Sequence, residues 1–501
     1  MSCYGELQIV GDATASMPEN QVPADYTAGM KQRRKHQTTA GKEDPLAGSA
    51  NDDNSEPKPS GILAGDGAQL GQAPPGESRN FIILVIYQAL MRTGWIFKTE
   101  SVIMPAVLDS LGGAKWMLGC LPLLNRFGQS IPPLLIARRI KVLPLKSRAF
   151  IGTTTSMALM FAGITAIWLV RLDRFPMIAS WIYLILYAMF FTAIGINQLT
   201  YNTLQGKLIR PTRRGRLLMI ADVVGVTSAV ACAILLLPRW LHEGTADFEW
   251  IFGFSTCLFA AASLMAWQIQ ELPDNHQEPR KPLRRLFDGA LRTLREDANF
   301  RRLAIVSALF TTALLLFPHY QSEARTKLNL GFPMLVWWVV AQNAGTGIFS
   351  ILTGPIADRF GNRRALIICT FLICAAPLVA ALLLTQEDLG KNSFSLVFVL
   401  IGLTPVAQKT FNNYTLEISP ASEHPRYLST QNLCMAAPLF LSPLAGYLVG
   451  VIGFLPVSLG ITAMLFTGFL LSFGLVEPRE RLPGSPVFDT GGDSSIDDTA
   501  I

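Results

Sequence analysis

Two arginines lie inside long apolar runs of the sequence, where charged side chains are costly. Arg92 falls in the run 81–107 and Arg126 in the run 115–137. Each lies about a dozen residues into its run, which places both near the centre of a bilayer if the run is helical, at about 1.5 Å per residue. An ionisable group at that depth costs at least about 2.5 kcal/mol, so both are functional candidates. Their guanidinium groups match carboxylate or phosphate, which makes an anionic ligand one natural partner.

Three acidic residues, Glu100, Asp222 and Glu417, also fall within the apolar runs or at their ends. A carboxylate beside a cation could exchange its place with a proton, so each is a candidate for proton coupling. We expect these acids to lie nearer the membrane surfaces than Arg92 and Arg126, which leaves the centre cationic and favours an anionic solute. The alternative is that Glu100 or Asp222 forms a structural ion pair with an arginine.

Uncharged polar and aromatic side chains extend this set of candidates. Trp95 follows Arg92 at helical spacing, and two later runs carry clusters of amide side chains. Such residues either bind a solute or pack between helices, where a polar contact contributes about 1 kcal/mol. The candidate substrate-binding residues are Arg92, Trp95, Arg126, Gln198, Tyr201, Asn202, Gln408, Lys409 and Asn412. Gln342 and Asn343 are further candidates, and His319, Tyr320 and Glu323 could form either an external gate or an interfacial belt.

Membrane-spanning helices must position these residues. The apolar runs are about 20 residues long, which is enough to cross a bilayer core of about 30 Å, whereas barrel strands alternate and are about half as long. The sequence therefore predicts an all-α integral membrane protein with twelve spans, the first of which contains Pro105 and could kink. The predicted spans are 81–107, 115–137, 149–170, 177–205, 217–238, 249–268, 303–323, 333–354, 365–385, 393–416, 427–450 and 455–476.

The chain divides into five segments by composition. Two six-helix bundles, 79–268 and 303–476, are flanked by tails that we expect to be disordered and cytoplasmic, 1–78 and the acidic 477–501. A linker, 269–302, joins the bundles. In this linker Leu283, Phe287, Leu291 and Leu294 share one helical face beside several arginines, which predicts an amphipathic helix on the membrane surface. The alternative is a polar linker with chance periodicity.

The basic residues indicate the orientation of the chain. With both termini in the cytoplasm, the cytoplasmic loops carry 22 Lys and Arg and the opposite loops carry 7, so we expect cytoplasmic termini. The net charge of +6 therefore reflects membrane topology. No basic stripe on a soluble domain suggests binding to nucleic acid.

Several other classes of protein lack support in the sequence. The seven cysteines form no C-x-x-C pair and the five histidines are scattered, so we expect no metal site and no cofactor. No P-loop is present, which excludes a primary pump within this chain. The short loops hold no set of acids or nucleophiles that would serve an enzyme, so we expect a protein that is not an enzyme.

The two halves of the chain resemble each other. QLTYN at 198–202 in the fourth predicted span matches QKTFN at 408–412 in the tenth. IARRI at 136–140 after the second span matches IADRF at 356–360 after the eighth. Both matches agree with the repeat of apolar runs, which indicates two parallel six-helix halves.

The loop after the eighth predicted span carries a family resemblance. It reads GPIADRFGNRR, from Gly354 to Arg364, and resembles the major facilitator signature G-x-x-x-D-R-x-G-R-[RK], with Asn362 in place of an arginine. The resemblance covers residues 80–476 and implies the major facilitator fold of two pseudo-symmetric six-helix bundles. We expect relatives in a bacterial branch of the superfamily, which implies the cell inner membrane.

The resemblance also implies a gate. In the family this loop acid contacts the start of a helix in the other half, which here places Asp358 near Arg216 and Leu217; the alternative is a solvated acid. Gly354 and Gly361 would allow close packing and a tight turn. The first half departs from the pattern, because Arg138 stands where the acid belongs. The candidate gating residues are Gly354, Asp358, Arg359, Gly361, Arg363, Arg364 and Arg216.

Together these features predict a secondary transporter that works by alternating access. We expect a monomeric, multi-pass protein whose partners are the lipid bilayer and a small-molecule substrate. An organic anion or polar metabolite is favoured, with coupling to protons or to exchange. The alternatives are efflux of amphipathic compounds, including drugs, and a membrane sensor of the same fold without flux.

Overall fold

A computed structural model describes residues 74–274 and 283–477. The predicted tails, 1–78 and 477–501, lie almost wholly outside the described residues. The described part of the chain is helical, apart from one isolated bridge between Leu241 and Ala246. The expected all-α class is confirmed.

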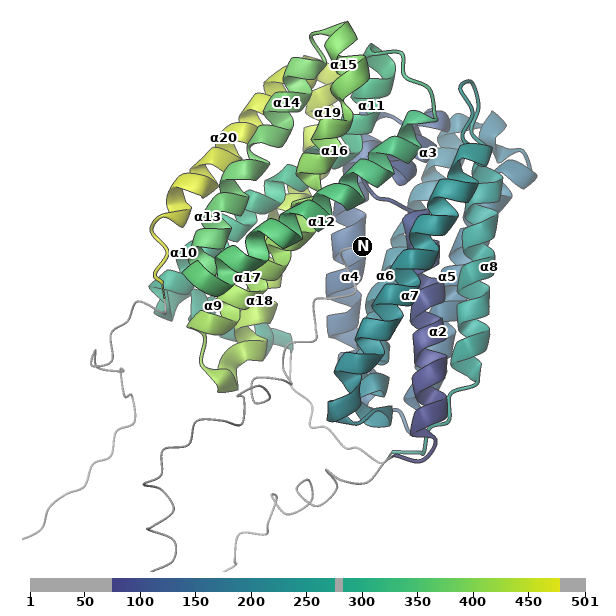
Figure 1. Cartoon of the computed structure of the whole chain (residues 1–501), viewed down its shortest axis with the longest axis vertical. Helices are drawn as coiled ribbons and strands as arrows, with labels where there is room; N and C mark the ends of the chain where they lie inside the picture. Colours follow the sequence, from purple (N-terminus) through teal and green to yellow (C-terminus); the bar gives the residue numbers. More distant parts are fainter. Residues whose placement is uncertain (1–73, 275–282, 478–501) are drawn as a thin grey trace, which may run out of the picture. The chain divides into compact units, whose positions relative to one another are not determined.

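Seven helices form the first bundle, coloured purple to teal in Figure 1. They are α2 (Glu77–Ile96), α3 (Ile103–Ser110), α4 (Lys115–Val142), α5 (Lys146–Leu169), α6 (Pro176–Leu208), α7 (Pro211–Trp240) and α8 (Phe248–Trp267). Proline stands at the start of α6 and of α7, where a helix makes no hydrogen bond through its backbone N–H, so the missing donor costs nothing. The six spans predicted for this half are all present.

The second bundle uses shorter pieces, and most of its predicted spans are divided. Its helices are α10 (Ala298–Thr311), η3 (Thr312–Leu316), α11 (Phe317–Lys327), α12 (Met334–Phe360), α13 (Asn362–Ile373), α14 (Ala375–Leu383), α15 (Glu387–Ser393), α16 (Ser395–Ile401), α17 (Thr404–Ile418), α18 (His424–Ala436), η5 (Ala437–Leu441), α19 (Ser442–Ile452) and α20 (Phe454–Ser472). The six predicted spans correspond in order to α10–α11, α12, α13–α14, α15–α17, α18–α19 and α20.

In the sequence, α9 (Leu283–Glu296) comes after the first bundle and before the second, where the linker helix was predicted. Leu291 is exposed and Leu294 packs partly against the core. Arg426 on α18 donates to Thr293 of α9 at 2.7 Å, which ties the linker helix to the second bundle.

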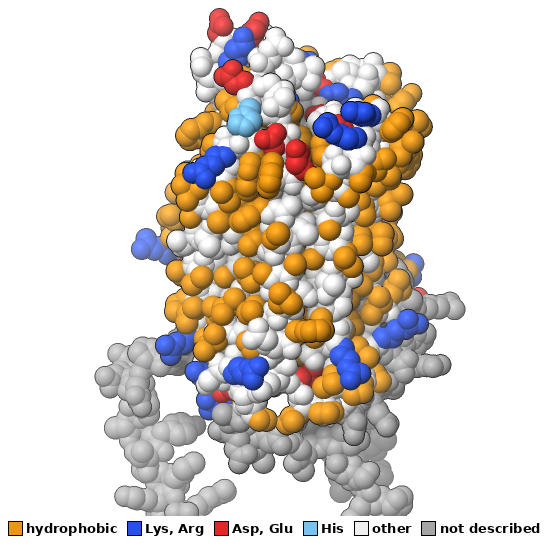
Figure 2. Space-filling view, turned by 90° about the vertical axis from the view of Figure 1, so that its right-hand side faces the viewer, with side chains coloured by type: hydrophobic (Ala, Val, Ile, Leu, Met, Phe, Trp, Pro, Cys, Tyr) orange, Lys and Arg blue, Asp and Glu red, His pale blue; other side chains and the backbone are white. Residues whose placement is uncertain are grey.

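Apolar composition separates two spans from the others. Among the described residues, nine helices are long and apolar enough to cross a membrane, or ten if the bent pair 387–418 is one span. The two remaining predicted spans are α2 with α3, and α4, which carry Arg92 and Arg126. Figure 2 shows a broad band of hydrophobic side chains between two ends where charged side chains gather, as expected for a membrane protein.

The first predicted span is broken. α2 ends at Ile96 and α3 begins at Ile103, so the break precedes Pro105 and does not occur at it. Within the break the Thr99 carbonyl accepts from the backbone N–H groups of Val102, Ile103 and Met104, at 2.9 to 3.3 Å. Pro105 lies in the first turn of α3, where a helix needs no N–H. The predicted kink is therefore a real interruption between two helices.

The internal repeat places equivalent residues in equivalent cores. Tyr201 on α6 is buried and stacks on Tyr87 of α2, with ring centres 6.1 Å apart. Phe411 on α17 is buried and packs on Phe310 of α10, at 5.3 Å. In both halves the fourth span thus packs an aromatic ring on the first span.

We call the end of the bundles that carries α9 and the loops 143–145, 209–210 and 419–423 the basic end, and the other the opposite end. In Figure 1 α9 lies at the lower end and α15 at the upper end. At the opposite end α4 packs closely on α19. A Cβ added to Gly446 would lie 2.5 Å from the Lys115 carbonyl oxygen and 3.2 Å from the Gly119 Cα, so the two backbones nearly touch. Glycine permits this approach between the bundles.

Candidate functional site

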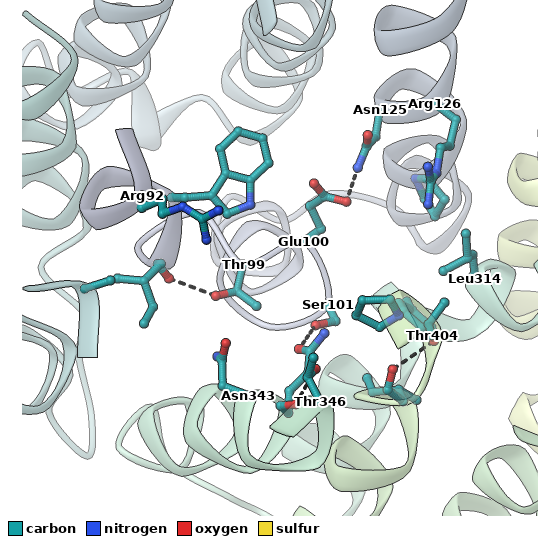
Figure 3. A pocket seen from close by; sticks show the side chains of 18 of the residues that line it. Arg92, Thr99, Glu100, Ser101, Asn125, Arg126, Leu314, Asn343, Thr346 and Thr404 are labelled. Atoms are coloured by element: carbon teal, nitrogen blue, oxygen red, sulfur yellow. Dashed lines mark hydrogen bonds between the residues drawn. The ribbon is translucent and has the colours of Figure 1, made fainter. Parts of the chain in front are cut away.

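A central pocket lies between the two bundles (Figure 3). Its empty volume is about 1310 Å³, including the open side. The first bundle lines it with the end of α2, the segment between α2 and α3, and parts of α4, α6 and α7. The second bundle lines it with η3, α11, α12, α16 and the start of α17.

Arg92 reaches this pocket from α2 beside Gly225 of α7. A Cβ added to Gly225 would lie 2.6 Å from the Arg92 Cδ, so the glycine makes space for the arginine stem. The guanidinium forms an ion pair with Asp222, one turn away on α7. The Arg92 side chain is mostly buried, whereas that of Asp222 is 52% exposed. Arg92 therefore both lines the pocket and carries the structural pairing that the sequence left open.

Glu100 lies in the same pocket and points toward Asn125 of α4, which donates to its carboxylate (Figure 3). The other carboxylate oxygen is 3.2 Å from the Lys98 ammonium. Lys98 has no exposed surface, and its ammonium lies 3.2 Å from the ring centre of Trp95. A cation over an aromatic face is stabilised by the ring quadrupole. A partly exposed acid and a fully buried base thus neutralise each other at the pocket wall.

The expectation of a purely cationic centre is wrong, because Glu100 lines the same pocket as Arg92 and Asp222 pairs with Arg92. In a continuous helix Glu100 would lie about 12 Å beyond Arg92. The helix instead ends at Ile96, and the following residues run toward the second bundle, where Ser101 donates to Gln342. The pocket therefore holds charges of both signs.

The wall contributed by the second bundle carries no charged side chain among its lining residues, and it combines polar with apolar ones. Asn343 donates to the Val339 carbonyl at 2.8 Å, and Thr346 donates to the Gly402 carbonyl at 2.9 Å. Thr404 stands at the start of α17 on the same side of the pocket. Figure 3 shows Asn343, Thr346 and Thr404 across the pocket from Arg92, Glu100 and Arg126.

The structure brings together only part of the predicted set. Arg92, Trp95 and Arg126 line the pocket. The others, which lie on α6 and α17, are not among its lining residues: Gln198, Tyr201, Asn202, Gln408, Lys409 and Asn412. Tyr201 belongs to the aromatic core of the first bundle, and the Gln408 amide donates to the Met435 sulfur at 3.2 Å. Lys409 is exposed, one turn beyond Pro405 toward the basic end.

Sequence reasoning missed five polar residues of the pocket: Ser101, Asn125, Tyr187, Thr346 and Thr404. Two of them had a usable signal. Asn125 precedes Arg126, and Thr346 follows Gln342 by one helical turn. Ser101 lies in the break between helices, which hydropathy alone does not reveal.

The candidate gating residues lie at the basic end. Asp358 and Arg359 are exposed in the last turn of α12, and Arg216 is exposed near the start of α7. Gly361 has φ +87°, which confirms the expected tight turn. Gly354 meets no atom within 4 Å of an added Cβ, so the expected close packing there is wrong.

The same end holds the remaining signature residues and Glu417. Arg363 donates to the Phe473 carbonyl at 2.8 Å, and the Arg364 guanidinium lies 5.5 Å from the Phe360 ring centre. The Asn362 amide donates to Glu417 at 2.8 Å. Glu417 therefore lies at the basic end and not in the central pocket.

A second ion network holds the first bundle at its basic end. The Glu271 carboxylate accepts from the Ser147 backbone N–H at 2.7 Å and from the Lys207 ammonium at 3.0 Å. Burial alone would raise the pKa of the Glu271 carboxyl, but these hydrogen bonds outweigh it and hold that pKa below 4.5. Glu271 is therefore ionised at neutral pH.

Polar contacts join the bundles at the opposite end. Asp109 on α3 accepts from Gln321 and Ser322 of α11, at 2.8 and 3.1 Å. Lys115 on α4 donates to Ser322 at 2.6 Å and lies 3.0 Å from Glu323. We call these five residues the seal.

The fold and the pocket define a class: a polytopic helical membrane protein built from two similar halves around a central cavity. The family model described as Major Facilitator Superfamily matches residues 315–492. A search of curated proteins found no match.

Solved structures share the fold over most of the chain. A point mutant of the nucleoside transporter NupG is 12% identical, with a TM-score of 0.61 over 79% of this chain and 100% of that one. A bacterial homologue of the iron transporter ferroportin, in an inward-facing state, is 11% identical, with a TM-score of 0.61 over 79% and 98%. A D-xylose–proton symporter is 13% identical, with a TM-score of 0.57 over 80% and 98%. The chain has the major facilitator fold, and its resemblance to this superfamily is confirmed.

Proposed function

We propose that this protein is a secondary transporter that moves a small solute across the membrane by alternating access. The observation that carries the proposal is a central pocket between two similar bundles, lined by charged and polar side chains. A solute held there touches both halves, so a rocking of one half against the other would expose it to either side.

The substrate that we favour is a small organic anion or a polar metabolite with an anionic group. Arg92 and Arg126 supply two permanent positive charges to the pocket wall, and their planar forks fit a carboxylate or phosphate. Gln342, Asn343 and Thr346 supply hydrogen-bonding groups for the rest of a polar solute. Glu100 and Asp222 offset part of the positive charge, which favours a solute of low net charge over a polyanion.

The Arg92–Asp222 pair supports a proposal of coupling to protons or to exchange. The guanidinium faces both the pocket and the Asp222 carboxylate. Protonation of Asp222 would release Arg92 toward an anion in the pocket, and loss of the proton would draw it back. A second solute could compete for Arg92 in the same way. Glu100 and Glu417 remain secondary candidates for the coupling acid.

A second candidate function is efflux of amphipathic compounds. One side of the pocket is apolar, because Val226, Ala229 and Val230 of α7 face it together with Trp95 and Phe317. A flat aromatic compound would fit against this surface. The charges beside it favour the metabolite.

For topology we propose that the basic end faces the cytoplasm with both termini, in a cell inner membrane, and that the chain works as a monomer. The excess of Lys and Arg in the loops of that end supports the orientation. An impermeant reagent that labels a tag at residue 1 or 501 from outside intact cells would reverse it.

The function is tested by counterflow into proteoliposomes that contain the purified protein. The labelled probes are lactate, succinate and glutamate, with glucose as an uncharged control. We expect uptake of at least one anion, its loss in Arg92→Gln, and normal uptake in the matched control Arg239→Gln, whose arginine lies at the exposed end of α7. Uptake of glucose alone, or normal anion uptake by a folded Arg92→Gln protein, would contradict the anion proposal. Absence of any flux would favour the sensor.

A further inference from the structure

His319 is a fully buried histidine that the pocket does not use. It lies on α11, three residues before Ser322, and its side chain has no exposed surface. Within the described part of the chain, neither of its ring nitrogens has a hydrogen-bond partner. Buried polar atoms without partners are uncommon and costly, so this arrangement needs a reason.

The position of His319 gives that reason, because it lies directly inside the seal. One turn along α11, Ser322 and Glu323 contact Asp109 and Lys115 of the other bundle. The interfacial belt that the sequence left open does not apply to His319 or Tyr320, because both are fully buried. When the seal opens, the two bundles part next to His319 and water reaches the imidazole.

We propose that His319 is a proton-binding site of the transport cycle, which is loaded from the opposite end of the membrane when the seal opens. The proposal rests on the alternating access proposed above. In the sealed state the described residues offer no hydrogen-bond acceptor for a second proton on the fully buried imidazole. Opening supplies water, so protonation and opening of the seal favour each other.

The charged groups around His319 agree with this assignment. Lys115 of α4 acts electrostatically on His319, Asp109 of α3 contacts Ser322 one turn further along α11, and Glu323 and Arg325 lie on the same helix as His319. Both acids already have partners, Gln321 and Ser322 for Asp109 and Lys115 for Glu323. The Lys115 ammonium adds a like charge next to any imidazolium. Among the residues that the structure describes, no acceptor is therefore in place to stabilise a charged His319.

The expected effect follows from linkage. If only the open state takes the proton, the ratio of open to sealed molecules rises by up to about tenfold per pH unit below the ordinary histidine pKa of about 6.5. Spin labels on Thr245→Cys, exposed in the loop between α7 and α8, and on Asn392→Cys, exposed in α15, report this ratio as a distance distribution. The native cysteines are replaced by serine, and the protein is measured in nanodiscs between pH 8 and 5.

We expect the longer distances to gain population as the pH falls, and His319→Gln to abolish this response. His242→Gln is the matched control, because His242 is exposed at the same end and should leave the response intact. A response that persists in His319→Gln, or one that only Asp109→Asn or Glu323→Gln removes, would overturn the proposal, as would no response in the parent protein.

A second measurement covers the case in which His319→Gln does not fold. Histidine-selective isotope labelling of the otherwise unchanged chain gives one NMR signal for each of the five histidines. We expect the His319 signal to titrate together with the change in label distance. A His319 signal that stays constant while the distance changes would exclude it as the site. The distance readout needs no substrate, so failure of this proposal is distinct from failure of the transport assay.

Discussion

Replacement of Gly446 by alanine should open the contact between α4 and α19. The new Cβ would lie 2.5 Å from the Lys115 carbonyl oxygen, whereas ordinary van der Waals contact begins at 3.4 Å. The obstacle is backbone, so no side-chain rotation relieves it, and the two helices must separate by about 1 Å. Overpacking of this kind costs about 1–3 kcal/mol.

This cost falls on the sealed state alone, because the contact exists only while the bundles meet at the opposite end. At about 1.4 kcal/mol per factor of ten, the ratio of sealed to open molecules should fall by about 5- to 100-fold. The gain in helix propensity from glycine to alanine is present in both states and cancels from the ratio.

The spin-label pair at Thr245 and Asn392 measures this change. Gly450→Ala is the matched control, because its Cβ would lie 3.5 Å from the Lys115 Cβ, an ordinary contact one turn further along α19. We expect longer distances in Gly446→Ala and the parent distribution in Gly450→Ala. Equal distributions in the two variants would refute the view that the glycine contact holds the bundles together.

Three further predictions concern the basic end. Gly361→Ala should lower the free energy of unfolding by about 1–3 kcal/mol, because alanine is strained at φ +87° and its Cβ would lie 2.5 Å from the Glu477 carboxylate. Gly354→Ala is the control: an added Cβ there meets no atom within 4 Å, so the thermal unfolding temperature should stay the same or rise. Glu271→Gln should lower the free energy of unfolding by about 1–3 kcal/mol at pH 7. The stabilisation by the ionised carboxylate is complete above pH 4.5, so the difference between variant and parent should shrink as the pH falls below 4.5 through the lowered pKa of Glu271. A difference that does not depend on pH would contradict the ionic role. Asp358→Asn should raise cysteine accessibility at the basic end, and unchanged accessibility would favour a solvated acid.

Most of the fold could be predicted from the sequence because the membrane imposes it. Without water in the bilayer core, runs of about 20 apolar residues must form helices, and the twelve predicted spans appear in order. The QLTYN and QKTFN repeat correctly paired α6 with α17, because Tyr201 and Phe411 occupy equivalent cores. The buried rings also explain why neither lines the pocket.

The candidate site could be predicted only in part. The position of Arg92 and Arg126 near the middle of their apolar runs correctly predicted that both line the pocket, because charged side chains at that depth are tolerated in a water-filled cavity. The contributions of Glu100 and Ser101 depend on the break after Ile96, a feature of backbone geometry. The ion-pair partner of Arg92 also depends on tertiary structure, because Asp222 is 130 residues away in the sequence and meets Arg92 only where α2 packs on α7.

The central claim is that the pocket between the bundles opens in turn to the two sides of the membrane. A cysteine at Asn343, which lines the pocket, tests it without knowledge of the solute, in a chain whose native cysteines are serine. An impermeant thiol reagent is added to right-side-out and to inside-out vesicles, with Gly460→Cys on the exposed surface of α20 as the lipid-facing control. Alternating access predicts that the pocket cysteine reacts from both sides while the control reacts from neither. Reaction of the pocket cysteine from one side only would contradict the account.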